Sequence, residues 1–229
     1  MNPKNKAILA LILLVPAPSI GTLFGMVIFP NSLAGALIFI ASKLWLFGLP
    51  VVWLMFVNRT PFSLSPPRHG GFKMGVFSGL LISGILLAMY WALADSFIGK
   101  QFLADKVTEI GLGTPSKYVG GALYWILVNS VLEEYVWRWF CVEQCEQFLS
   151  KRLAIVCSAL FFTLHHIVAV AVFFKPATVV ACAIGVFAAG AIWSMMYIRY
   201  RSVWPGYISH AIVDLCIFGI GASIVFGIR

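Results

Sequence analysis

The amino-acid sequence predicts an all-α membrane protein, a polytopic bundle of about seven (seven to eight) transmembrane helices. Of its 229 residues, 61% are hydrophobic and only 10% are charged, with a mean hydropathy of +0.96. An ordinary soluble domain has about a quarter of its residues charged. Apolar runs of about 20 residues, long enough to cross a bilayer, recur along the whole chain. Short segments containing Pro, Gly, Lys or Arg separate these runs.

Seven stretches are apolar enough to span a membrane, and we expect a single integral membrane domain over residues 1–229. The first begins like a signal peptide, with MNPKNK before AILALILLV, but apolar sequence resumes through GTLFGMVIF, which favours an uncleaved helix. Residues 98–118 place apolar side chains along one face, which predicts a short interfacial helix or an eighth span. The predicted spans are 7–29, 33–57, 74–98, 118–140, 153–174, 177–197 and 203–227.

The distribution of lysine and arginine predicts a cytoplasmic N-terminus. In that orientation nine basic residues outside the spans lie on the cytoplasmic side and five lie on the outer side, as the positive-inside rule requires. The short loops are typical of a bacterial inner (plasma) membrane protein. The cytoplasmic set is Lys4, Lys6, Arg59, Arg68, Lys73, Lys151, Arg152, Arg199 and Arg201, and the outer set is Lys100, Lys106, Lys117, Lys175 and Arg229.

The net charge of +8 does not indicate nucleic acid as a partner. Lysine and arginine occur singly or in pairs between apolar runs, so the excess fits membrane topology and contact with anionic lipids of the bilayer. The five cysteines form no CxxC pair, and the sequence therefore supports neither a disulfide framework nor a cysteine-based zinc site.

Eight charged or histidine side chains inside the predicted spans are candidates for a functional role. Such groups cost at least a few kcal/mol each in hydrocarbon, so they face the bundle interior and usually mark function. Lys43 has no acidic residue in its own span, and we interpret it as a snorkelling or bundle-pairing lysine. The eight are Lys43, Glu133, Glu134, Arg138, His165, His166, His210 and Asp214.

The spacing of the charges on span 118–140 distinguishes its two carboxylates. Glu134 and Arg138 are four residues apart, share a helix face and can neutralise each other. Glu133 falls outside that pairing, and a desolvated carboxylate without a paired cation is a competent general base. At 1.5 Å per residue, Glu133 and His210 each lie about 10 Å from the expected cytoplasmic ends of their helices, so the two can meet.

Each of these features alone has a structural explanation, such as an ion pair within one helix or a histidine that ties two helices together. Three of them at compatible depths on three helices favour a catalytic site. Two alternatives come from other classes of protein. A non-proteolytic immunity or scaffold protein would use the bundle for binding, and a proton-coupled transporter would use Glu and His as a relay. A transporter usually has inverted repeats, and none is visible in this sequence.

Three motifs in this chain resemble those of the CPBP family of intramembrane proteases, which includes the CAAX prenyl endopeptidases and proteins of the bacteriocin-immunity type. EEYVWR at 133–138 is similar to the family's EExxxR motif. The stretch from Phe162 to His166 is similar to FxxxH, and the stretch from His210 to Asp214 is similar to HxxxN or HxxxD. The motifs occur in the family's order, and the resemblance covers a motif-bearing core of about 118–216.

The resemblance implies an all-helical bundle with a cavity open to the membrane, in which a peptide bond of a membrane-embedded or lipid-anchored peptide or protein substrate is hydrolysed. It implies that Glu133 activates the attacking water. The implied support for this reaction is the Glu134–Arg138 pair, assistance by His166, and oxyanion stabilisation by His210 with Asp214.

His165 also fits FxxxH, counted from Phe161, and is assigned a supporting place. We prefer His166 because of the SALFF register, and because adjacent helical residues are not expected to face one cavity. We expect no metal cofactor. The alternative is a divalent metal such as zinc, held by Glu133, His166 and His210.

Overall fold

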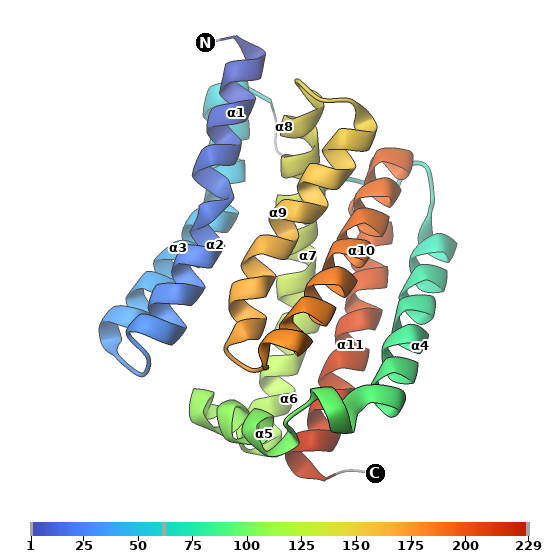
Figure 1. Ribbon diagram of the computed structural model, residues 1–229. Helices are drawn as coiled ribbons and strands as arrows, with labels where there is room; N and C mark the ends of the chain where they lie inside the picture. Colours follow the sequence, from blue (N-terminus) through green and yellow to red (C-terminus); the bar gives the residue numbers. More distant parts are fainter. Residues whose placement is uncertain (1, 61–62, 228–229) are drawn as a thin grey trace.

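The computed structural model describes residues 2–60 and 63–227, and every regular element in these ranges is helical (Figure 1). The all-helical prediction is confirmed. The elements of the described chain join end to end into eight helices. Their bounds are α1 (Pro3–Leu14), α2 (Pro16–Thr22), η1 (Leu23–Ile28), α3 (Leu33–Val52), η2 (Trp53–Asn58), α4 (Phe72–Phe97), α5 (Lys100–Val107), η3 (Thr108–Leu112), α6 (Pro115–Leu123), η4 (Tyr124–Asn129), α7 (Ser130–Glu134), η5 (Tyr135–Val142), α8 (Glu143–Glu146), α9 (Lys151–Ala171), α10 (Pro176–Tyr200) and α11 (Trp204–Phe226).

Six of these helices are long and apolar enough to cross a membrane, so the chain is an integral membrane protein. They correspond to six of the seven predicted spans. The stretch predicted as 118–140 belongs instead to a longer helix that runs without a break from α6 to α8, and its acidic and basic residues make it less apolar than the others. Within the described residues the six are Pro3–Ile28, Leu33–Asn58, Phe72–Phe97, Lys151–Ala171, Pro176–Tyr200 and Trp204–Phe226.

Residues 98–118 contain the short helix that the sequence predicts, as α5 followed by η3. In Figure 1 this segment lies across one end of the bundle, at the same end as the C-terminus. The N-terminus lies at the opposite end, together with the turn between α8 and α9. Successive helices therefore alternate in direction. Arg229, counted above with the outer basic residues, lies outside the described residues.

Local sequence explains where several helices begin. The side chain of Ser32 accepts a hydrogen bond from the Gly35 amide at 3.0 Å and caps the start of α3. Proline occupies the first turn of α6, α10 and α11, where its missing N–H and fixed φ are tolerated. These local signals determine where α3, α6, α10 and α11 begin.

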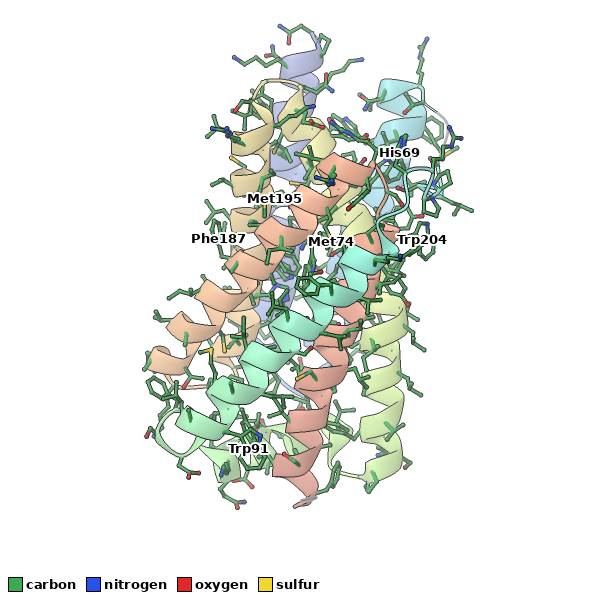
Figure 2. All side chains as sticks on the ribbon, turned by 90° about the vertical axis from the view of Figure 1, so that its right-hand side faces the viewer. His69, Met74, Trp91, Phe187, Met195 and Trp204 are labelled. Atoms are coloured by element: carbon green, nitrogen blue, oxygen red, sulfur yellow. The ribbon has the colours of Figure 1, made fainter. Side chains whose placement is uncertain are left out.

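The outside of the bundle is apolar, as a lipid-facing surface requires. Figure 2 shows the side of the molecule with α4 in front, where Met74, Trp91 and Met195 lie on the surface. Trp91 is 81% exposed. Inside, α4 packs closely along α11, because Gly75 allows its backbone to approach the backbone of Pro205; a Cβ there would overlap the Pro205 carbonyl oxygen. The buried charges lie where α7, η5, α9 and α11 meet.

Candidate active site

The predicted ion pair between Glu134 and Arg138 is present and completely buried. Arg138 Nε lies 3.4 Å from Glu134 Oε1, and both side chains are 0% exposed. The Arg138 guanidinium also lies over the rings of Phe162, at 4.3 Å, and Trp193, at 5.1 Å. Such cation–π contacts favour a desolvated guanidinium. The phenylalanine of the FxxxH motif therefore covers the arginine of the EExxxR motif.

Glu134 also positions His210. Its Oε1 atom lies 3.1 Å from His210 Nδ1, which makes Nδ1 the donor and leaves Nε2 facing the site. The imidazole stacks on Trp193 with the ring centroids 4.0 Å apart and the planes 18° from parallel. Gly206, one helical turn before His210, lets Glu134 approach α11, because any Cβ there would collide with Glu134 Oε2.

Glu133 lies among imidazoles. It is 4% exposed, with Oε1 at 3.7 Å from His165 Nε2 and Oε2 at 3.9 Å from His210 Nε2. Both separations exceed a direct hydrogen bond and match a gap that one water can bridge. The paired Glu134 and the imidazole-lined Glu133 thus occupy different surroundings, as the spacing of the charges predicts.

Both histidines of α9 lie beside Glu133, which corrects the expectation that only one of them could. Ligand atoms of Glu133, His165 and His166 all lie within 4.8 Å of one another. The Cα–Cβ bonds of adjacent residues diverge, but imidazole side chains are long enough to converge again, and the two ring centroids are 4.1 Å apart. His165 stacks on Trp137 at 5.2 Å, whereas His166 Nδ1 lies 2.9 Å from the Phe162 carbonyl and leaves Nε2 free.

Asp214 lies near His210 on the same helix, but its hydrogen bond is to Ser130. Its Oδ2 atom lies 3.7 Å from His210 Nε2, beyond hydrogen-bond distance, and accepts a bond from Ser130 Oγ at 2.6 Å. Glu134, rather than Asp214, therefore holds His210 in place. The Ser130 bond fixes Asp214 near the free nitrogen of His210, where its carboxyl faces the reacting region.

Comparison with known proteins agrees with this geometry. Residues 115–216 match the family described as Rce1-like, type II CAAX prenyl endopeptidase. The chain contains a CAAX protease domain. No curated protein and no solved structure matches the chain. The matched range runs from the first helical turn of α6 to the middle of α11 and includes all three motifs.

Residues 115–216 therefore form a domain of the CPBP family of intramembrane proteases. The buried cluster of Glu133, His165 and His166 is consistent with its active site. Every predicted site residue of the domain, from Glu133 to Asp214, lies in this one buried region.

Several residues around the site were not singled out from the sequence. They are the two tryptophans that stack on histidines, the serine that bonds to Asp214, the glycine against Glu134, and an asparagine that binds Lys43. Three of the set lie in the helix segment around EEYVWR, where spacing of four residues from the glutamates gives a usable signal. The set is Asn129, Ser130, Trp137, Trp193 and Gly206.

The donor atoms around Glu133 fit a divalent metal, although with a different ligand set from the one expected. One carboxylate and two imidazoles are common donors for catalytic zinc. The set that the structure brings together within the described residues is Glu133, His165 and His166, with His210 outside it. The bond from His166 Nδ1 to a backbone carbonyl is the usual orienting contact of a metal-bound histidine. A bound metal would supply Lewis acidity and a more acidic water.

Exchanging each α9 histidine for phenylalanine tests their relative roles. We expect His166→Phe to lower the cleavage rate by about 10²-fold or more, the size of a general acid–base contribution. The smaller loss is expected for His165→Phe, because a ring at 165 keeps the stacking on Trp137. Steady-state rates and melting temperatures of both purified variants provide the measurement. Equal losses at matched stability, or the reverse order, would overturn the assignment of His166.

Proposed function

We propose that the protein is an intramembrane endopeptidase that hydrolyses a peptide bond in a membrane-embedded or lipid-anchored substrate through a water activated by Glu133. The observation that carries this proposal is the position of Glu133. It is buried, it has no cation partner on its own helix, and imidazole nitrogens of α9 and α11 lie 3.7 and 3.9 Å from its two oxygens. A water beside these groups contacts both a carboxylate base and imidazole nitrogens that can exchange a proton with it.

The reaction follows from the contacts. Glu133 accepts a proton as the water oxygen attacks the carbonyl carbon, and the carbonyl oxygen becomes an oxyanion. His210, which Glu134 holds through Nδ1, stabilises that oxygen as an imidazolium whose Nε2–H donates to it, and the neighbouring Asp214 can donate to it only as the protonated acid. The carbon–nitrogen bond then breaks as the proton held by Glu133 passes, with the help of His166, to the leaving amine nitrogen.

Glu134 and Arg138 support this chemistry without reacting. Their pairing leaves Glu133 as the free carboxylate, and the contact of Glu134 with His210 Nδ1 directs Nε2 toward Glu133. His165 fills the space between Trp137 and Glu133 and stays a supporting residue in this proposal.

The proposed membrane topology adds the motif-bearing helix as a seventh span. The helix from α6 to α8 lies among the six apolar spans, and α9 and α11 pack against its central part. The three charges in its central part, Glu133, Glu134 and Arg138, are buried. We place the N-terminus in the cytoplasm of a bacterial inner membrane, from the distribution of lysine and arginine, and treat the chain as a single domain.

Metal dependence is tested by chelation. Because Glu133 and the surrounding imidazoles suffice for water activation and proton transfer, we expect the rate to be unchanged after dialysis against 1,10-phenanthroline. The measurement is the cleavage rate before dialysis, after dialysis, and after zinc is added back. A loss that zinc reverses would assign Glu133, His165 and His166 as metal ligands.

The function is tested with purified protein in proteoliposomes. The probes are a fluorogenic farnesylated peptide ending in a CAAX sequence and a fluorogenic transmembrane peptide. We expect a new peptide C-terminus, identified by mass spectrometry, from at least one probe. If neither is cleaved while a pH gradient drives uptake of a solute, the transporter alternative gains support. Binding of a probe without cleavage favours the immunity or scaffold alternative.

A further inference from the structure

Lys43 approaches the candidate active site from a helix outside the CAAX protease domain. Its ammonium donates a hydrogen bond to Asn129 Oδ1 at 3.2 Å. Asn129 is buried and lies one helical turn before Glu133, so both side chains are on the same face of the motif-bearing helix. The ammonium is also 5.9 and 5.6 Å from the ring centroids of Phe39 and Phe47 on its own helix. The bond to Asn129 places the ammonium against the motif-bearing helix, one helical turn from Glu133.

The depth of Lys43 argues against a snorkelling role. It lies ten residues after Leu33, the first residue of α3, or about 15 Å of helix rise. The other end of that span, at Asn58, is farther away. Lys43 is partly buried, and its ammonium binds a buried asparagine at this depth instead of reaching a helix end. A charge in that position is expensive unless another group compensates it.

Glu133 is the carboxylate that compensates it. Glu134 is already paired with Arg138, and none of the described carboxylates forms a direct ion pair with Lys43. Glu133 lies one helical turn after Asn129, the residue that binds the ammonium. Asp214, the other carboxylate of the region, lies beside His210 and accepts a bond from Ser130. Glu133 is therefore the carboxylate that faces Lys43.

We propose that Lys43 is a positioning residue of the active site, a fixed positive charge that α3 places beside Glu133 and that Asn129 holds in place. The proposal rests on the proposed function of Glu133 as the base. When the water attacks, its proton moves to Glu133 and the negative charge moves from Glu133 to the carbonyl oxygen. A fixed positive charge on this side of the site lowers the barrier to the extent that it attracts the oxyanion more strongly than it attracts Glu133.

The first experiment separates turnover from substrate binding. Lys43→Met is expected to lower kcat by about 10- to 100-fold with KM unchanged, and Lys43→Arg to recover most of kcat, because the charge is restored. The matched control is Lys6→Met, since Lys6 also donates one bond, to the Val57 carbonyl at 3.1 Å, but far along the bundle. This control is expected to keep the wild-type kcat and KM.

Two results of that experiment would overturn the proposal. A raised KM with an unchanged kcat would make Lys43 a binding residue for an anionic part of the substrate. A wild-type kcat for Lys43→Met, alongside an inactive Glu133→Gln variant, would leave the proposed function intact and remove Lys43 from the site.

A second experiment does not depend on catalysis. Melting temperatures of Lys43→Met, Glu133→Gln and the double variant form a thermodynamic cycle. We expect the double variant to be less destabilised than the sum of the single variants, because each single change leaves one charge uncompensated. Additive shifts would show that the two charges are not coupled and would contradict the inference, whether or not any probe is cleaved.

Discussion

Replacing Glu133 by glutamine is expected to reduce peptide cleavage by at least about 10²-fold, the lower end of what a general base contributes. Glutamine keeps the size of the side chain and its polarity but cannot accept the proton of the attacking water. The fold should persist, because Glu133 makes no close ion pair in its own helix and its nearest imidazole contacts are 3.7 and 3.9 Å away. Initial cleavage rates in proteoliposomes measure the effect.

The control is Glu109→Gln, which removes a carboxylate that forms an exposed pair with Lys106 at 2.7 Å on the outer segment. It should retain the wild-type rate. Turnover by Glu133→Gln at the wild-type rate would show that another group is the base, and Glu134 would be the first residue to examine.

Replacing Arg138 by methionine is expected to destabilise the protein by about 3–5 kcal/mol, the usual cost of breaking a buried ion pair. The change leaves Glu134 buried, without its cation, among Trp193, His210 and Gly206. The double variant Glu134→Leu/Arg138→Met removes both charges and should melt at a higher temperature than Arg138→Met alone. Thermal unfolding in detergent gives the order of stability.

The matched control for this series is Arg201→Met. Arg201 forms a two-bond pair with Glu146 at 2.6 and 2.8 Å, but the Arg201 side chain is 41% exposed. Its loss should therefore cost at most about 1 kcal/mol. A double variant no more stable than Arg138→Met would show that Glu134 and Arg138 do not compensate each other.

The same double variant separates stability from activity. The sequence predicts only that Glu134 and Arg138 neutralise each other while Glu133 acts as the base. On that basis, removing both charges should restore part of the activity that Arg138→Met loses. The structure changes this expectation, because Glu134 also holds His210 through Nδ1. We therefore expect a stable double variant with little activity. Recovery of the wild-type rate would mean that His210 needs no carboxylate partner.

The sequence predicted the fold well where the physical signal was local. Apolar run length predicts a transmembrane helix directly, and six such helices are present in the described chain. The pairing of Glu134 with Arg138 also follows from spacing within one helix. The motif-bearing helix was predicted too short, because its polar residues interrupt the apolar pattern while α6 to α8 continue from Pro115 to Glu146.

Contacts between helices could not be predicted in the same way. The partner of His210 depends on the rotation of α11 against α7, and this rotation brings Glu134 closer than Asp214, which is on the same helix as His210. Lys43 had no acidic residue in its own span, and its partner Asn129 lies 86 residues later. Spacing along the chain carries no information on either contact.

Isotope incorporation during peptide cleavage tests the central claim most directly. The wild-type protein and the Glu133→Gln variant are incubated with a cleavable probe in water enriched in oxygen-18, and the products are examined by mass spectrometry. We predict that the new C-terminal carboxylate formed by the wild type contains one oxygen-18 atom, and that the variant forms almost no product. Product without the isotope, or labelled product formed equally by both proteins, would contradict hydrolysis by a water that Glu133 activates.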